Sequence, residues 1–207
     1  IEHAQQGGHS GAHILYLPEH EAALLPEPWL RRVQPRYVWR HRGETTFEDL
    51  LDRLPGKQRK NIRRERRRVE QSGLDIQWHR ADQLADDEWP RLYALYASTY
   101  EARGQAPYLN LACLRLWAHS FGERMLFCIA REHGIALAMA FFFEDQGSLY
   151  GRHWGAARHV DGLHFELCYY QGLERCLQRG LLHFDAGVQG EHKRTRGFEP
   201  ELSHSAH

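Results

Sequence analysis

The sequence has little cysteine and no long apolar segment. Its 207 residues include four cysteines with no CxxC motif, and we expect these to be small buried residues in a reducing compartment. The longest apolar run, from Ile135 to Phe143, has the length of a strand and is too short to cross a bilayer. No secretory signal is present. These absences predict a soluble, cytoplasmic protein without disulfides; because the first residue is Ile1 and not Met, we expect it to be part of a longer chain.

The sequence also lacks net charge, since 27 basic residues balance 27 acidic ones. The positive and negative charges are not evenly distributed along the chain. The segment from Lys57 to Arg68 holds eight basic residues and one acid, Glu65. The remainder has 19 basic and 26 acidic residues, a net charge of −7. Two interpretations fit such a segment equally well. It binds a polyanion, or it forms ion pairs with the acidic remainder of the protein.

The pattern of the chain predicts a mixed α/β (α+β) fold. Hydrophobic periodicity and turn residues define the elements. Four prolines make residues 18–35 mostly irregular, and Thr46 with Asp49 predicts a capping box. We divide the chain into an N-terminal irregular segment with short strands (1–45) and one domain (46–207). Strands are expected at 13–17, 36–40, 74–80, 125–132, 135–144, 148–154 and 182–186, and helices at 46–52, 57–71, 87–103, 110–121 and 163–179.

The last strand–helix–strand unit implies a parallel pair with a crossover, and hairpins precede it. We therefore predict a mixed sheet with a helix packed on it. Sites in such sheets lie beyond the carboxyl ends of parallel strands. The chemistry is accordingly expected between about Tyr150 and Pro200, where three polar segments stand out.

The first segment is the strand from Leu149 to Gly155. Regular alternation would place Tyr150, Arg152 and Trp154 on one face and His153 on the other with the glycines. Glycine in a strand permits close approach to the backbone. We take Arg152, His153 and Trp154 as candidate substrate-binding residues. The alternative is a bulge with a cation–π pair.

The second segment is the start of the helix predicted at 163–179. His164 and Glu166 fall in its first turn, where Glu166 either takes part in catalysis or stabilises the helix. Glu174 falls in an apolar seam with Leu163, Leu167, Tyr170, Leu177 and Leu181, and a buried carboxylate needs a partner or a catalytic role.

The third segment follows the last predicted strand. Glu191 supplies a base, His192 a titratable imidazole and Lys193 an anion binder, with Gln189 and Arg196 beside them. Surface charge alone is the alternative. The histidines and carboxylates of these segments do not follow HExxH or a similar spacing, so we predict no metal site.

Together these segments resemble a known family. LYGRHWG, HFELCYYQGLE, AGVQGEHKRTRGFEP and the final SHSAH resemble the FemAB-like predicted N-acyltransferases of the GNAT superfamily (GCN5-related N-acetyltransferases), as do TFEDLLDRLP and QRKNIRRERRRV upstream. The resemblance covers residues 13–207. It implies a GNAT fold, in which two parallel strands splay apart around the acyl donor; here these are 148–154 and 182–186. It also implies that this is the C-terminal half of a protein with a related upstream half.

The resemblance suggests acyl or aminoacyl transfer, with aminoacyl-tRNA or acyl-CoA as donor substrate and no permanently bound cofactor. Fem transferases add amino acids from aminoacyl-tRNA to peptidoglycan precursors. The loop at 155–162 lacks the glycine spacing of a CoA pyrophosphate cradle, and Asp161 would repel phosphate.

In this hypothesis the residues take three roles. Glu191 or Glu174 accepts a proton, with Glu166 a further catalytic candidate, and Tyr169 or Tyr170 protonates the leaving group. The remaining candidates bind substrate: Arg152, Lys193 and Arg196 hold donor phosphates, and Arg63, Arg64 and Arg67 bind a polyanionic donor. Two other hypotheses stay open: a non-catalytic module that binds nucleic acid or a cell-wall precursor, and a scaffold half whose active site lies in the upstream half.

Overall fold

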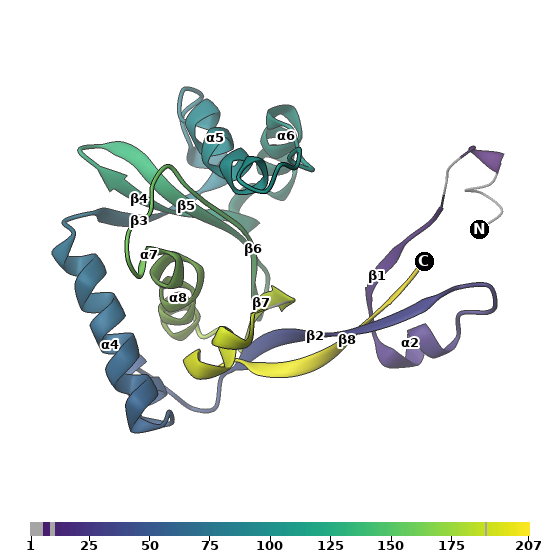
Figure 1. Ribbon diagram of the computed structural model, residues 1–207, viewed down its shortest axis with the longest axis horizontal. Helices are drawn as coiled ribbons and strands as arrows, with labels where there is room; N and C mark the ends of the chain where they lie inside the picture. Colours follow the sequence, from purple (N-terminus) through teal and green to yellow (C-terminus); the bar gives the residue numbers. More distant parts are fainter. Residues whose placement is uncertain (1–5, 9–10, 189) are drawn as a thin grey trace.

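One eight-stranded mixed sheet organises the chain (Figure 1). The computed structural model describes residues 6–8, 11–188 and 190–207. The strand order is β1-β8-β2-β7-β6-β5-β4-β3, and every neighbouring pair is antiparallel except β6 with β7. The strands are β1 (Ile14–Leu17), β2 (Arg31–Arg40), β3 (Asp75–Arg80), β4 (Met125–Glu132), β5 (Ile135–Glu144), β6 (Ser148–Ala156), β7 (His183–Val188) and β8 (Glu199–Ala206).

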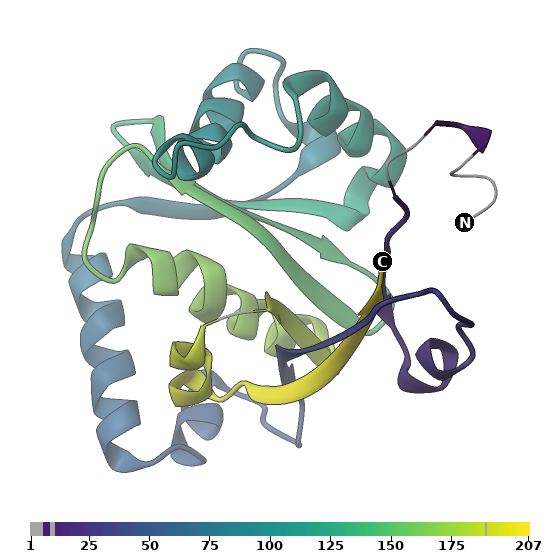
Figure 2. The ribbon, with the colours of Figure 1, turned by 45° about the vertical axis from the view of Figure 1, so that its right-hand side comes forward.

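Helices cover both faces of the sheet (Figure 2). One face carries α5 (Trp89–Glu101) and α6 (Leu111–Phe121). The other carries α3 (Phe47–Asp52), α4 (Gly56–Gln71) and a continuous helical segment made of α7 (Leu163–Phe165), the π-helical turn η3 (Glu166–Tyr170) and α8 (Gln171–Arg179). Short elements complete the fold: α2 (Glu19–Ala23), η1 (Ala81–Gln83), η2 (Gly122–Arg124) and the 3₁₀ segment η4 (Glu191–Arg196). Within the described residues, no helix is long and apolar enough to span a membrane.

Each face of the sheet packs its own apolar core. Phe127, Met139 and Phe141 of β4 and β5 pack with Leu92 and Tyr96 of α5. The opposite core joins alternate residues of the same strands to the helices of the other face, and its fully buried members include Cys128, Ala140, Phe142, Leu167, Leu173 and Phe184. Because β4 and β5 are covered on both faces, they are near-continuous apolar runs with charged residues only at their carboxyl ends, and their predicted bounds are confirmed.

The predicted capping box and the inward residues of α4 are also confirmed. The Thr46 hydroxyl accepts from the Asp49 amide, and the Asp49 carboxylate accepts from the Thr46 amide. On α4, the apolar residues Ile62 and Val69 are both buried. All four cysteines are free; Cys128 and Cys176 are buried as predicted, whereas Cys113 and Cys168 are only partly buried.

The prediction for the N-terminal region was wrong in two respects. Residues 18–35 include the helix α2, and β2 begins at Arg31 and not at Arg36. Pro35 is tolerated within β2 because the ladder to β7 begins only at Arg36, so no neighbour on that side requires its missing N–H. β2, although within residues 1–45, pairs with both β7 and β8 of the domain predicted at 46–207.

β8 was not predicted because its pattern is inverted. Ser203 and Ser205 are buried, whereas Leu202 is 69% exposed. The alternation of apolar and polar residues that marks a half-buried strand is therefore absent from this segment.

Candidate functional site

β6 and β7 pair only at their amino ends and then separate. The parallel ladder runs from Ser148 opposite His183 to Tyr150 opposite Asp185. β6 nevertheless continues to Ala156 and β7 to Val188. The predicted splayed pair is thus present, and the gap opens toward the carboxyl ends of both strands.

An open hollow of about 420 Å³ lies at the carboxyl end of β6. Trp154 of β6 and His164 of α7 line it, with their ring centroids 5.2 Å apart and the rings edge to face. Ser98 and Thr99 of α5 also line it, together with Ala156 and residues 158–162. Two of the predicted substrate-binding residues therefore meet in one hollow.

The faces predicted for β6 were wrong because of a bulge at Arg152. Gly151 is opposite Phe142 and His153 is opposite Phe141, so Arg152 has no partner residue on β5. Trp154 consequently packs in the same core as Leu149, five positions earlier, which regular alternation forbids. Arg152 is exposed, and its guanidinium carbon lies 5.6 Å from the Tyr150 ring centroid. The bulge and the cation–π pair of the alternative interpretation are thus both present at Arg152.

His153 and Gly155 face α5, on the side of the sheet away from His164. The Tyr100 hydroxyl lies 3.0 Å from Nδ1 of His153. Burial, with a smaller contribution from Arg152, lowers the pKa of His153 to about 4. The backbone approach that the glycines permit is made by the protein itself: a Cβ at residue 155 would overlap the Leu95 carbonyl of α5.

The turn η3 displaces Glu174 from the seam in which it was predicted. A π turn adds one residue to the helical repeat and so rotates everything after it. Leu173 and Cys176 occupy the buried face of α8, and Glu174 lies at its edge with a side chain that is 29% exposed. The predicted placement of Glu174 in the seam was wrong for this reason, whereas Leu177 and Leu181 pack in the core as predicted.

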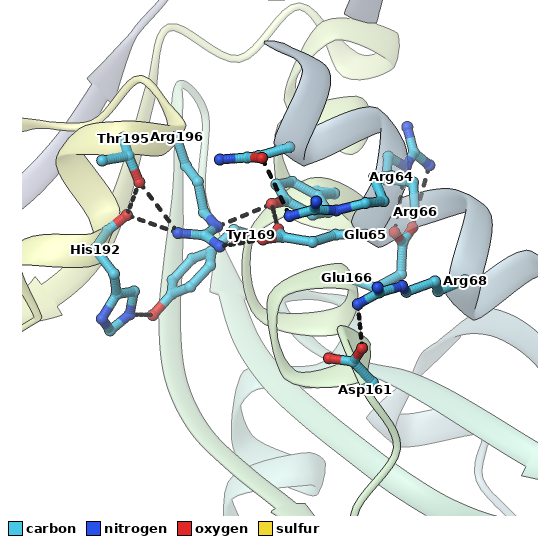
Figure 3. Close-up of polar contacts among 12 residues, drawn as sticks. Arg64, Glu65, Arg66, Arg68, Asp161, Glu166, Tyr169, His192, Thr195 and Arg196 are labelled. Carbon is cyan, nitrogen blue, oxygen red and sulfur yellow. Dashed lines mark hydrogen bonds and ion pairs between the residues drawn. The ribbon is translucent and has the colours of Figure 1, made fainter. Parts of the chain in front are cut away.

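Both carboxylates of this helical segment bind Arg66 of α4 (Figure 3 shows the contact with Glu166). Arg66 donates to Glu174 at 2.7 and 3.0 Å and to Glu166 at 3.1 and 3.2 Å. Glu166 is nearly fully buried, at 5% side-chain exposure, and also accepts from Gln171. The partner that a buried carboxylate requires is therefore supplied by the basic helix.

A second ion-pair network joins α4 to η3 and η4 (Figure 3). Arg196 donates to both oxygens of Glu65 at 2.9 Å and to the Tyr170 hydroxyl at 2.8 Å. The Tyr170 hydroxyl in turn donates to Glu65. The Arg196 guanidinium carbon lies 3.6 Å from the ring centroid of Phe165. Tyr170 and Arg196 thus act together in holding three elements against one another.

Tyr169, the other candidate proton donor, lies between His164 and His192. Its hydroxyl is 3.0 Å from Nε2 of His192, and its ring meets that of His164 edge to face, with centroids 5.6 Å apart. Burial, followed by the nearby His192, Arg196 and Lys193, lowers the pKa of His164 to about 4. Burial also lowers the pKa of His192 and raises that of Tyr169. Both imidazoles are therefore neutral at pH 7.

Lys193 closes the carboxyl end of β7. Its ammonium donates to the carbonyls of Ala186, Gly187 and Val188 at 2.7, 3.1 and 3.3 Å. The residue is buried, and burial lowers its pKa to about 8. In this arrangement, Lys193 holds three consecutive carbonyls at the end of β7 in place.

Glu191 is the candidate carboxylate most open to solvent, at 79% side-chain exposure. It accepts from the Tyr37 hydroxyl of β2 at 2.9 Å, and Arg194 lies 3.6 Å from it. Gln189, which was predicted beside it, lies outside the described residues.

The loop between β6 and α7 is a poor cradle for a diphosphate. Its Arg158 is paired with Glu132, and its Asp161 is paired with Arg68 of α4. Gly162 has a positive φ of 85° and packs against the backbone of Glu65. The loop is thus fixed by contacts within the protein and directs a carboxylate toward α4.

The three arginines predicted on α4 differ in their surroundings. Arg63 is paired with Glu48, whereas Arg64 contacts Asn61 and Arg67 is exposed. Among the described residues, no group of three His, Cys, Asp or Glu side chains is placed to hold a metal ion.

Sequence reasoning missed Glu65, Arg66 and Tyr37 as members of these networks. A signal for the first two was present, because they lie three and four positions after Ile62 and before Val69, on the buried face of α4. Tyr37 carried no such signal, because the contact with Glu191 depends on the pairing of β2 with β7.

Comparison with known proteins supports the resemblance. The family model FemAB-like, described as peptidoglycan biosynthesis and recognition, matches residues 1–207. The chain belongs to the FemAB-like family. The comparison with curated proteins gives no significant match.

Solved structures show the same fold at low sequence identity. L-PGS from Bacillus licheniformis is similar with a TM-score of 0.66 and 13% identity, over 100% of this chain and 70% of that one. FemX is similar with a TM-score of 0.59 and 10% identity, over 88% and 63%. A protein named as a GNAT-family acetyltransferase, from Novosphingobium aromaticivorans, is similar with a TM-score of 0.50 and 16% identity, over 100% and 78%. The predicted GNAT-like fold of this FemAB-like chain is thereby confirmed.

Proposed function

We propose that this FemAB-like chain is an N-acyltransferase or aminoacyltransferase that moves an acyl group from an activated donor to an amine. The observation that supports this most is the early end of the β6–β7 ladder, with an open hollow at the carboxyl end of β6. Beyond Tyr150, β6 stays paired with β5, but its other edge has no partner strand among the described residues and leaves main-chain amides available to polarise a donor carbonyl. Trp154 and His164 would bind the part of the substrate that enters the hollow.

In the proposed reaction the acceptor amine attacks the donor carbonyl carbon. A C–N bond forms, and the C–O or C–S bond to the carrier breaks. Of the two carboxylates put forward as base, Glu191 is the more available, because it is exposed to solvent whereas Glu174 is held by Arg66. Glu191 takes the proton from the amine, and Tyr169 gives a proton to the leaving group. The neutral His192 then acts as a relay: it passes its Nε2 proton to the Tyr169 oxygen and takes up a solvent proton on Nδ1, while Glu191 releases its proton to solvent.

The donor is proposed to be aminoacyl-tRNA, with acyl-CoA as the alternative. The β6–α7 loop favours the tRNA ester, because its arginine is already paired and its Asp161 would oppose a diphosphate. The family description makes a peptidoglycan precursor the natural acceptor to test.

A non-catalytic binding module is the second candidate. Arg66 engages Glu166 and Glu174 at once, so two of the candidate catalytic carboxylates are structural in this state. Ion pairing of these carboxylates is what we expect of a protein that binds polyanions tightly but transfers no acyl group.

Single-turnover transfer assays decide between these functions. We expect transfer from at least one donor class, aminoacyl-tRNA or acyl-CoA, to amine acceptors that include a peptidoglycan precursor. Glu191→Gln should lower the rate by roughly 10²-fold or more, as loss of a general base does. Glu174→Gln serves as the matched change. Equal, small effects of both substitutions would remove both carboxylates from the role of base, and no transfer from either donor would favour the binding module.

A further inference from the structure

The charged residues of α4 separate into three groups around the helix axis. The face toward the protein carries Ile62 and Val69, which are buried, and the paired residues Glu65 and Arg66. The charge on this face is satisfied internally, since Glu65 binds Arg196 while Arg66 binds Glu166 and Glu174. These residues dock the helix and are not available to a partner.

Two arginines border the docked face and are also neutralised. Arg63 pairs with Glu48 next to α3, and Arg68 pairs with Asp161 in the β6–α7 loop (Figure 3 shows the second pair). Each carries a carboxylate within ion-pair distance, so neither adds much to the positive potential outside the protein.

Four of the five remaining basic residues form a row on the outward side; the fifth, Arg59, donates to the carbonyls of Asp52 and Leu54. Lys57, Lys60, Arg64 and Arg67, which we call the outer row, follow steps of three and four residues. At 100° per residue they fall within an arc of about 80°, directly opposite Ile62 and Val69, and they extend over about 15 Å of helix. All four are exposed, and within the described part of the chain none has a carboxylate partner. The outer row is therefore a linear array of uncompensated cations.

The chemistry of the outer row restricts what binds it. A helix that lies on a membrane directs apolar side chains to the lipid, but the two apolar residues of α4 are buried in the core. A protein partner usually supplies an apolar or aromatic anchor, and none of the exposed large apolar side chains belongs to α4. The same absence of aromatic side chains argues against single-stranded nucleic acid, whose bases stack on such side chains.

We propose that the outer row binds the phosphate backbone of double-stranded RNA. Lys and Arg contacts to phosphates need neither bases nor apolar anchors, and duplex RNA is recognised mainly through its shape, its backbone and its 2′-hydroxyls. The inference does not depend on acyl transfer. If the donor is aminoacyl-tRNA, the same contacts hold its helical stem beside the loop that borders the hollow, because Arg68 joins α4 to that loop.

The test is fluorescence anisotropy with a labelled 20-base-pair RNA duplex of arbitrary sequence, across a salt series. If the ~−0.9 per phosphate contact of duplex DNA applies, four contacts predict a log–log slope of affinity against salt of about −3 to −4. The variant Arg64→Gln/Arg67→Gln should reduce the slope by about 2. It should also weaken binding by roughly tenfold in low salt.

The matched control is Arg63→Gln/Arg68→Gln, which removes the same two charges from the same helix. Because these arginines are paired with Glu48 and Asp161, affinity and slope should change less than half as much. Equal losses in both double variants, at preserved folding by circular dichroism, would show a response to net charge only and would overturn the proposal. It would also be overturned by stronger binding to a single strand of the same length or to phosphatidylglycerol vesicles. Lys57→Gln/Lys60→Gln provides an independent repeat if the first pair fails to fold.

Discussion

Arg66 of α4 and Glu174 of α8 form a two-pronged ion pair, with N–O distances of 2.7 and 3.0 Å. The same guanidinium reaches Glu166, and its carbon lies 4.5 Å from the Phe47 ring centroid. One arginine thus joins α3, α4 and the π-containing helical segment. One side of the basic helix α4 therefore docks it on the protein through ion pairs, while the other side, the outer row, is exposed and its positive charge is not paired.

Removal of Arg66 should destabilise the protein much more than neutralisation of Glu174. Arg66→Gln leaves Glu166 buried without its cation, and the loss of one partner of a buried pair typically costs about 3 kcal/mol. Glu174→Gln leaves Arg66 with Glu166 and changes a partly exposed group, so we expect a loss of about 1 kcal/mol or less. Urea unfolding measures both. Equal effects would mean that the network does not dock α4.

Gly155→Ala should be among the most damaging small substitutions in the chain. The added methyl group would overlap the Leu95 carbonyl, and neither the strand nor α5 can withdraw without opening the core. We expect a loss of at least about 3 kcal/mol, or insoluble protein. Gly147→Ala is the control, because no heavy atom of the described residues lies within 4 Å of its Cβ position. Similar thermal stability of the two variants would show that α5 does not approach β6 this closely.

Much of the fold could be predicted because its signals are local. β4 and β5 are apolar runs bounded by turn residues, and the capping box at Thr46 involves only residues within four positions of one another. β8 could not be found in this way, since it buries Ser203 and Ser205 while Leu202 is exposed. This segment forms a strand because it pairs with β1 on one side and with β2 on the other.

The candidate site was less predictable because it depends on single-residue shifts. The bulge at Arg152 and the π turn at Glu166–Tyr170 each add one residue to a regular repeat. Trp154 thereby joins the face that carries Leu149, and Glu174 leaves the seam. Periodicity assumes that a repeat is unbroken, so it cannot report such insertions.

Stability should fall as pH decreases from about 6.5 to 4. His153 and His164 each have a pKa of about 4 in the folded protein, against an ordinary value near 6.5 in the unfolded chain. Between these values the unfolded chain binds protons that the folded protein does not, so the free energy of unfolding decreases, by about 3 kcal/mol for each group at most. The full stabilisation is present above pH 6.5.

The measurement is urea unfolding at several pH values for the wild type, His153→Gln and His164→Gln. Each substitution should remove one histidine's contribution to the fall in the free energy of unfolding between pH 6.5 and 4. The two effects should add, because the rings lie on opposite faces of the sheet. Curves that keep the wild-type slope would show that these imidazoles are as accessible in the folded protein as in the unfolded chain.

Substitution of the two neighbouring tyrosines should separate catalysis from stability. Tyr170→Phe removes a hydroxyl that binds both Glu65 and Arg196 in a buried network, so we expect a loss of about 2 kcal/mol. Tyr169→Phe removes one hydrogen bond to the exposed His192, at a cost nearer 1 kcal/mol.

Acyl transfer should show the reverse order. If Tyr169 protonates the leaving group, Tyr169→Phe lowers the single-turnover rate by roughly 10²-fold or more. Tyr170→Phe should keep most of the rate at temperatures where the variant is folded. Leaving groups of lower pKa need less protonation, so a donor with an activated ester should restore transfer to Tyr169→Phe and have no such effect on Glu191→Gln. A deficit in Tyr169→Phe that persists with the activated donor would assign the hydroxyl to positioning of His164 and His192.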